Sequence, residues 1–335
     1  MEKPKRKNDK SPIKIWSKKR FFGVIVLAVA YGWFSWYTFA ELRFDETLSP
    51  AFISFLIFVP IAIGAFSIYT IPPVLRTPFR VITLAIATII LFLVVAVISN
   101  PVILLCVAMA AFPIVALGAI GALLNMIYTK YMRNKKKKNT QYAIAGLLLI
   151  LPYILAPIEA NVEPSSWYRT VETEVIINDT TPEEVWNSIV RMQPISPAEQ
   201  RPSWYHLMGI PRPTEATLEG EGVGSIRTGY FESGLSFEEE VTLWQPYRAM
   251  EFDVEVLLNS EATPVLREIG GAYYDLISAG YELEAVDDHT VRLSLHSEYR
   301  LSTNFNFYGA IWADWIMEDF QNYVLNTVKT RIENN

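Results

Sequence analysis

The fold of the first half of the chain is decided by residues 81–129, which read VITLAIATIILFLVVAVISNPVILLCVAMAAFPIVALGAIGALLNMIYT. These 49 residues contain no charged side chain. A membrane-spanning helix needs roughly 20 apolar residues, so the run is too long for one span. Ser99, Asn100 and Pro101 interrupt it, and proline cannot continue a helix without removing a backbone hydrogen bond. The sequence therefore predicts two spans, residues 81–98 and 102–128.

Three further apolar runs flank this stretch and complete a membrane domain of residues 21–160. Two precede it, at residues 21–40 and 48–69, and the shortest follows it, at residues 142–158. None of the five carries an ionisable side chain in its middle, where transporters and proton pumps place such groups. We therefore expect the membrane domain to serve as an anchor or scaffold.

Charge is distributed very unevenly along the chain. Residues 1–160 contain 18 Lys and Arg against 6 Asp and Glu, a net charge of +12, and nine of those cations lie in the tail of residues 1–20. Residues 161–335 contain 11 against 29, a net charge of −18. Such a split indicates two halves in two environments. Phosphate binding needs clustered Lys and Arg, so the acidic half argues against a nucleic-acid partner.

Basic and non-basic connections alternate along the membrane domain. The tail, the segment between the second and third spans and the segment between the fourth and fifth are basic. Because basic connections stay in the cytoplasm, this pattern predicts an integral plasma (inner) membrane protein with a cytoplasmic N-terminus and an extracytoplasmic domain at residues 161–335. If the fifth run lies in the membrane interface instead, that domain faces the cytoplasm. We interpret the basic tail as a topology signal that contacts anionic membrane lipids.

The second half alternates between strand and helix patterns after a polar linker at residues 161–170. Apolar alternation over residues 171–177 predicts a strand, and Thr181 followed by Glu184 predicts a reciprocal capping box that starts a helix over residues 182–192. Residues 194–213 contain five prolines and predict a long, packed loop. Further strands are predicted at residues 224–231, 236–244, 249–257, 273–285 and 290–301.

A long amphipathic helix is predicted to close the chain over residues 308–332. Its apolar stripe consists of Tyr308, Ile311, Trp312, Trp315, Ile316, Phe320, Tyr323, Val324, Val328 and Ile332. Outside that stripe lie Asp314, Glu318, Gln321 and Lys329. The order of strand, helix, antiparallel strands and closing helix predicts an α+β domain with a sheet wrapped on one helix.

Residues 171–335 resemble the SRPBCC superfamily, the START/Bet v1-like or polyketide cyclase/dehydrase-like proteins. The segments that carry the resemblance are VETEVIINDTTPEEVWNSI, GEGVGSIRTGYF, FEEEVTLWQPYRAMEF, HTVRLSLHSEYRL and WADWIMEDFQNYVL. The resemblance implies a helix-grip fold, in which a curved antiparallel sheet surrounds the C-terminal helix and a deep apolar cavity. It also implies binding of a lipid or another hydrophobic small molecule, and some members are enzymes. The superfamily has no universal catalytic residue, so the resemblance assigns no reaction.

Glu239 is the candidate for chemistry inside this domain. Alternation places it on the face of its strand that carries Phe237, Val241 and Leu243. A carboxylate among apolar side chains either has a raised pKa or pairs with a cation, and Arg227 on the neighbouring strand is the candidate partner. Such a pair is suited to orienting a ligand carbonyl or to acid–base catalysis. A purely structural ion pair is the alternative.

Other side chains are candidates for the wall and the entrance of the implied cavity. For the wall we predict, besides Arg227 and Glu239, the residues Tyr230, Tyr281, Tyr308, Trp312 and Trp315. For a gate in the proline-rich loop we predict Trp204, Tyr205 and His206.

Several kinds of chemistry lack the residues they need. Cys106 is the single cysteine, so no intrachain disulfide forms. The three histidines show no metal-ligand spacing, and we expect neither a metal nor another cofactor. The glycines of residues 220–224 lead into a strand, whereas a phosphate-binding loop leads into a helix, so they predict a flexible turn. No Ser-His-Asp or Cys-His pattern is present.

The sequence thus favours a membrane-anchored binding protein that holds a hydrophobic small molecule or lipid in its C-terminal domain. Two alternatives remain open. One is a cyclase-, dehydratase- or hydrolase-like enzyme that uses Glu239 with Arg227 or Tyr230. The other is an assembly or sensor protein whose soluble domain binds a protein partner.

Overall fold

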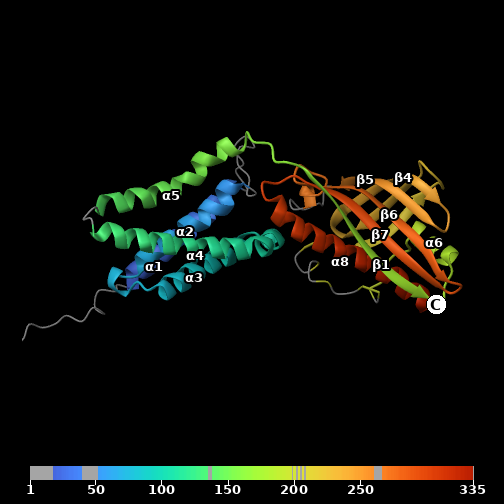
Figure 1. Cartoon of the computed structure of the whole chain (residues 1–335), viewed down its shortest axis with the longest axis horizontal. Helices are drawn as coiled ribbons and strands as arrows, with labels where there is room; N and C mark the ends of the chain where they lie inside the picture. The colour runs from blue at the N-terminus through green and yellow to red at the C-terminus, as the bar shows by residue number, and fades with distance from the viewer. Residues whose placement is uncertain are drawn as a thin grey trace, which may run out of the picture. The chain divides into compact units, whose positions relative to one another are not determined.

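The computed structural model describes residues 18–39, 52–134, 138–197, 199–200, 203, 206, 209–259 and 266–334. The chain divides into two compact units, an N-terminal helical unit and a unit formed chiefly by Pro164–Asn335 (Figure 1).

Each of the five predicted apolar runs overlaps one helix of the helical unit. These helices are α1 (Lys18–Tyr37), α2 (Val59–Ser67), α3 (Pro78–Ser99), α4 (Leu104–Asn134) and α5 (Lys138–Glu159). Short helical turns flank α2 and precede α4: η4 (Ser54–Phe58), η5 (Ile68–Thr70), η6 (Pro73–Leu75) and η7 (Pro101–Ile103). The predicted break at residues 99–101 is confirmed, because α3 ends at Ser99 and α4 begins after the turn η7.

Within the part of the chain that the structure describes, three helical stretches are long and apolar enough to cross a membrane. They are Lys19–Tyr37, Pro78–Ser99 and Leu104–Tyr131. Among the described residues, the other two apolar stretches, Ser54–Thr70 and Gly146–Glu159, are shorter. Three of the five predicted spans therefore have the length and composition that crossing a membrane requires, and the crossing itself stays a prediction. Of the runs predicted at residues 48–69 and 142–158, the described part of the first is helical over Ser54–Thr70, and the second lies within α5, which is 22 residues long.

Small residues let the backbones of α2 and α4 approach closely. A Cβ atom added at Gly64 would lie 1.8 Å from the carbonyl oxygen of Gly118, and one added at Gly121 would lie 2.2 Å from the backbone of α2. Beside this contact, Nδ2 of Asn125 donates to the carbonyl oxygen of Ala65 at 2.5 Å. Packing of this kind is how helices associate in lipid, where no hydrophobic effect drives them together.

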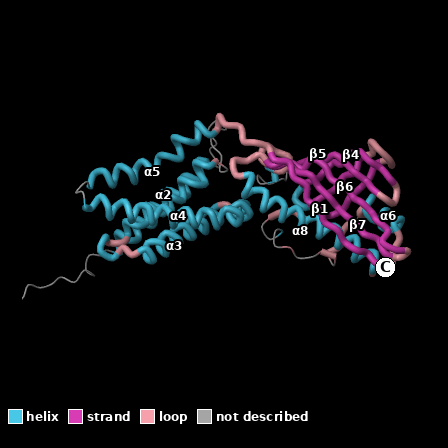
Figure 2. Tube along the Cα trace, in the orientation of Figure 1, coloured by secondary structure: helices cyan, strands magenta, loops and turns pink. Residues whose placement is uncertain are grey.

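The C-terminal unit is built on one seven-stranded antiparallel sheet (Figure 2, magenta). Its strands are β1 (Trp167–Asn178), β2 (Pro213–Glu219), β3 (Ile226–Phe231), β4 (Leu235–Gln245), β5 (Ala249–Leu258), β6 (Tyr274–Asp287) and β7 (Thr290–Leu301). The order across the sheet is β1-β7-β6-β5-β4-β3-β2. Strands β2 to β7 are therefore neighbours in sequence order, and β1 adds to the free edge of β7.

Among the described residues, two helices pack against this sheet, α6 (Pro182–Val190) and α8 (Asn306–Glu333). The apolar core lies between these helices and the sheet, and its fully buried members include Ile177, Ile189, Leu293 and Leu325. One long C-terminal helix packed on a curved antiparallel sheet is the helix-grip arrangement, as predicted.

The start of α6 confirms half of the predicted capping box. Oγ1 of Thr181 accepts a hydrogen bond from the backbone N–H of Glu184 at 3.3 Å. The Glu184 carboxylate does not return to the Thr181 backbone but accepts from the hydroxyl of Thr180 at 3.1 Å. A second hydroxyl directly before the cap thus takes the place of the backbone donor.

The two largest differences from the predicted strands lie in β1 and β2. β1 begins at Trp167, so the predicted linker of residues 161–170 shortens to 161–166. Residues 167–170 are exposed and show no apolar alternation, so the sequence pattern missed them. Their backbone nevertheless pairs with β7, beginning with Trp167 opposite Leu301. Strand β2 was not predicted, because Pro213 and the preceding prolines indicate a loop. Its proline is tolerated because β2 is an edge strand.

The predicted stripe of α8 is confirmed toward the end of the helix, where Tyr323, Val324, Val328 and Ile332 are buried, but not in its first half. Ile311 and Trp315, predicted to face inward, are exposed, whereas Gln321, predicted to face outward, is completely buried. Nε2 of Gln321 donates to the carbonyl oxygen of Val171 at 2.9 Å and to Oγ of Ser297 at 3.0 Å. These polar contacts with β1 and β7 fix the rotation of the helix.

Candidate functional site

A buried ion pair lies at the centre of the candidate site. Arg227 on β3 and Glu239 on β4 are directly opposite each other in the antiparallel register, and their side chains form a hydrogen-bonded ion pair. Only 5% of the Arg227 side chain and 12% of the Glu239 side chain are exposed. The sequence therefore identified a pair that the structure brings together.

The predicted inward face of β4 ends at a β-bulge. Phe237 and Val241 pack into the core on the side of Glu239, as expected. The register shifts after Val241, so Trp244 rather than Leu243 packs against the core, with its ring edge-on to Trp186 at 5.0 Å. A bulge inserts one residue and reverses the alternation beyond it, which is why the prediction for Leu243 was wrong.

The guanidinium of Arg227 has aromatic neighbours and a spare donor. Its Cζ atom lies 5.7 Å from the ring centre of Phe252 and 5.8 Å from that of Tyr281. Nη2 donates to the carbonyl oxygen of Ile189 at 3.3 Å. Nε is buried and has no hydrogen-bond partner among the described residues. Because a buried, unsatisfied donor costs about 1–3 kcal/mol, this N–H is a natural point of contact for an acceptor group.

Burial determines the protonation behaviour of Glu239. Loss of water raises the pKa of the Glu239 carboxyl above its usual value, and the charge and hydrogen bond of Arg227 oppose that rise. Burial likewise raises the pKa of the Tyr281 hydroxyl. The site therefore combines one permanent cation, one carboxyl whose proton affinity is increased, and one neutral phenol.

Gly229 is the next inward position of β3 after Arg227. A Cβ atom added there would lie 3.4 Å from Oε1 of Glu239. A larger side chain at this position would occupy the space beside the carboxylate. Gly229 thus lies directly against the Glu239 carboxylate, a feature that sequence analysis did not single out.

The predicted tyrosines lie on opposite faces of the sheet. Tyr281 is buried beside Arg227, and its ring is 6.2 Å from that of Phe252. Tyr230 is 40% exposed and does not join the cluster. It is three residues from Arg227 on the same strand, and an odd separation places the two side chains on opposite faces. The prediction that Tyr230 lines the interior is therefore wrong.

The aromatic residues predicted on the C-terminal helix lie near its start. Trp315 is exposed, while Tyr308 and Trp312 are half-buried. The side chains that α8 directs into the core lie further along the helix, and they include Met317 and Val324. The first turns of α8 thus present Trp315 to the surface rather than to the Arg227 cluster.

One of the three predicted gate residues is described. His206 lies in the proline-rich segment, with Nδ1 3.0 Å from the carbonyl oxygen of Ile210 and its ring edge-on to Tyr323 at 5.5 Å. Burial lowers the pKa of His206. The other two predicted gate residues, Trp204 and Tyr205, lie outside the described residues, so the gate stays a prediction.

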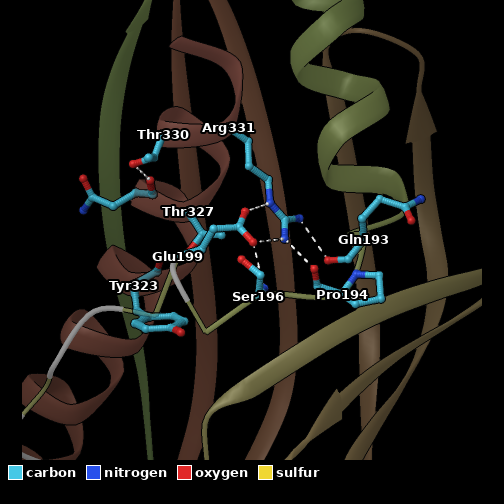
Figure 3. Close-up of polar contacts among 9 residues, drawn as sticks. Gln193, Pro194, Ser196, Glu199, Tyr323, Thr327, Thr330 and Arg331 are labelled. Carbon is cyan, nitrogen blue, oxygen red and sulfur yellow. Dashed lines mark hydrogen bonds and ion pairs between the residues drawn. The ribbon is translucent and has the colours of Figure 1, made fainter. Parts of the chain in front are cut away.

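A polar cluster ties the start of the proline-rich segment to the end of α8 (Figure 3). Arg331 binds the carboxylate of Glu199 through Nε, and its Nη atoms donate to the carbonyl oxygens of Gln193 and Pro194, each at 2.9 Å. The backbone N–H of Ser196 donates to Glu199 at 2.7 Å. The hydrogen bond from Arg331, followed by that from Ser196, lowers the pKa of Glu199 to about 2. No local pattern links residues so far apart in sequence, so this cluster was not predicted.

Two surface clefts lie at the same end of α8. The larger, about 660 Å³, is bordered by α6, α8 and the residues Arg191 and Gln193. The smaller, about 420 Å³, lies beside Arg331. Neither Arg227 nor Glu239 lines either cleft. Within the described residues, no group of three or more His, Cys, Asp or Glu side chains is arranged to hold a metal ion.

Comparisons with known proteins give similarities of fold for about half of the chain. Similar solved structures include an aromatase/cyclase from Streptomyces sp. R1128, at 13% identity and a TM-score of 0.32, with 50% of this chain and 95% of that chain covered. Norcoclaurine synthase from Thalictrum flavum, in complex with dopamine and hydroxybenzaldehyde, gives 12% identity and a TM-score of 0.32, with 51% and 90% covered. A conserved protein from Geobacillus kaustophilus gives 12% identity and a TM-score of 0.31, with 50% and 96% covered.

No family model and no curated protein matches the chain. The helix-grip assignment therefore rests on the strand order and on the packing of α8 against the sheet.

Proposed function

We propose that this chain is a membrane-anchored binding protein whose C-terminal domain holds a hydrophobic small molecule or lipid with a polar acceptor group. The observation that carries the proposal is the buried Arg227, which has one carboxylate partner, two aromatic neighbours and an Nε donor without a partner among the described residues. A helix-grip domain that follows apolar helices of spanning length in the same chain is the setting that such a ligand needs.

The chemistry of the pair narrows the ligand class. Arg227 and Glu239 together are neutral, so a neutral carbonyl, ester or hydroxyl oxygen can accept from Arg227 without adding charge to the interior. A carboxylate ligand would place a second anion beside Glu239, and the raised pKa of Glu239 favours proton uptake to compensate. The rings of Phe252 and Tyr281 provide apolar surface around that contact.

The test compares ligand retention between the wild type and a variant that lacks the pair but keeps a filled core. Arg227→Met with Glu239→Leu replaces the buried ions by apolar side chains of similar size, a change that is often neutral or stabilising. A matched control, Arg292→Met with Glu284→Leu, removes an ion pair that is partly exposed on β6 and β7. Each full-length protein is purified in detergent, and its bound molecules are detected by native mass spectrometry and by solvent extraction.

We expect a bound apolar molecule in the wild type and in the control, and loss of it in the Arg227/Glu239 variant. Equal retention in all three proteins, or no bound molecule in any of them after exposure to lipid extract, would contradict the proposal.

The anchor is tested separately by washing membranes at alkaline pH, which strips peripheral proteins. We expect the chain to remain in the membrane fraction.

A second candidate function is an enzyme in which Glu239 acts as acid or base. The observation that favours it is the carboxyl with a raised pKa next to a cation and a phenol. Tyr281 replaces Tyr230 as the candidate hydroxyl, because Tyr230 lies on the other face. Once the retained molecule is identified, Glu239→Gln separates the two functions. An enzyme loses turnover while it still binds the molecule, whereas a binding protein converts nothing in either form.

A further inference from the structure

The first half of α8 carries an exposed apolar face that the ligand site does not use. Phe307, Ile311 and Trp315 follow one another at intervals of four residues, so they share one face of the helix. Their exposed fractions are 67%, 63% and 47%. The ring of Trp312 lies 5.6 Å from that of Trp315 and extends the face. Exposed apolar surface of this kind marks an interaction site.

Two more exposed aromatic residues lie at the same end of the domain. Trp167 and Tyr168 begin β1, where they pair with the last residues of β7. The start of α8 is held to the chain just before them, because Nδ2 of Asn306 donates to the carbonyl oxygen of Ser165 at 2.5 Å. One end of the domain therefore presents apolar side chains from both β1 and α8.

The same end receives the chain from the last apolar helix. Helix α5 ends at Glu159, so residues 160–164 are all that separate it from Ser165. Six residue steps of extended chain span at most about 20 Å. The domain is thus tethered by the end that carries the exposed aromatic residues.

We propose that the face formed by Phe307, Ile311 and Trp315 docks on the surface of the lipid bilayer. Tryptophan and tyrosine are enriched at membrane–water interfaces because they combine an apolar ring with a polar atom. The net charge of −18 over residues 161–335 opposes attraction to anionic headgroups, so the docking depends on apolar contact with zwitterionic lipid. It rests on the membrane anchor and is independent of the Arg227 site.

A spin label on this face measures the docking directly. Cys106 is the single cysteine and is replaced by serine, after which Ile311→Cys introduces one labelling position in the full-length protein. The matched control is Val286→Cys, exposed at the opposite end of the sheet beside the turn between β6 and β7. Each labelled chain is placed in nanodiscs of phosphatidylcholine, and power-saturation EPR compares collisions with oxygen and with a water-soluble nickel chelate.

We expect the label at position 311 to favour oxygen over the nickel chelate, and the label at position 286 to show the reverse. Addition of anionic lipid shifts the label at position 311 toward the water-soluble reagent. Equal access to the nickel chelate at both positions overturns the proposal. Shielding of position 311 from both reagents overturns it as well, because the face is then covered by protein, either from the same chain or from a second copy.

Discussion

Removal of Arg227 alone is expected to destabilise the C-terminal domain strongly. In Arg227→Met the Glu239 carboxylate stays buried without its cation, and a buried pair broken from one side costs about 3–5 kcal/mol. For a domain of this size 1 kcal/mol corresponds to about 2–4 °C, so Tm falls by about 6–20 °C. Differential scanning fluorimetry reports on this region through Trp186 and Trp244, whose rings contact each other in the core.

The loss of stability in Arg227→Met depends on pH, and the protonation of Glu239 sets the direction of that dependence. Burial raises the pKa of this carboxyl, and removal of Arg227 takes away the charge that opposes the rise. A carboxyl with a raised pKa in the folded state favours folding at low pH, where it is protonated, and loses that contribution as pH rises through the folded pKa. The deficit of Arg227→Met is therefore larger at pH 8 than at pH 5.

A second substitution, Glu239→Leu, shows whether Arg227→Met is destabilised by the unpaired buried carboxylate or by the loss of packing contacts. Adding Glu239→Leu to Arg227→Met removes the unpaired carboxylate, so the double variant recovers most of the lost stability and its pH dependence disappears. The reasoning is refuted if Arg227→Met melts within about 2–4 °C of the wild type, which corresponds to 1 kcal/mol. It is also refuted if the double variant is no more stable than the single one.

Three further predictions concern other contacts. Glu199→Gln weakens the contact with Arg331 and lowers stability by about 1 kcal/mol, because the pair is partly solvated. The depressed pKa of Glu199 makes this contribution complete above pH 4.5 and lost as pH falls toward about 2, which acid titration of both proteins measures. Gly64→Ala forces α2 away from α4 and costs about 1–3 kcal/mol, seen as earlier thermal aggregation in detergent. Gly23→Ala meets no atom within 4 Å and is the neutral control. Gln321→Leu leaves its buried partners on β1 and β7 unsatisfied and costs about 1–3 kcal/mol, measured by thermal unfolding, and an unchanged Tm would contradict its role in fixing α8.

Helices and strands were predictable from the sequence wherever the spacing of apolar side chains matches the residues that are buried. The uncharged stretch of residues 81–129 produced two helices with their break at the expected proline. The alternating runs over residues 236–257 and 273–301 produced β4 to β7 with boundaries shifted by one or two residues. In these segments one physical cause, the removal of apolar side chains from water, determines both the pattern and the structure.

The remaining differences arise where backbone pairing or polar contacts override that pattern. Trp167 joins β1 because its backbone finds a partner, although its side chain is exposed. The Gln321 side chain faces the core because it forms three hydrogen bonds there with residues of β1 and β7. Trp315 lies on a different side of the helix and is therefore exposed. No periodicity encodes either choice.

The candidate site was predictable only in part, for the same reason. Glu239 was identified because it interrupts an apolar face of its strand, and Arg227 because it is a cation on the neighbouring strand that could pair with it. Tyr281 was predicted for the wall and lies beside Arg227, whereas Gly229 was missed because it contributes by having no side chain.

The placement of β1 beside β7 has a consequence for biosynthesis. The strands β2 to β7 follow one another, so each can pair with its predecessor as soon as it leaves the ribosome. β1 is made first but has no partner until β7 begins at Thr290, which is 112 residues after the end of β1 at Asn178. At translation rates of about 5–20 residues per second, β1 stays unpaired for about 6–20 seconds. During that interval its apolar side chains form an open edge of the kind that chaperones bind and that promotes aggregation, so the nascent chain is most vulnerable just before the C-terminal helix appears.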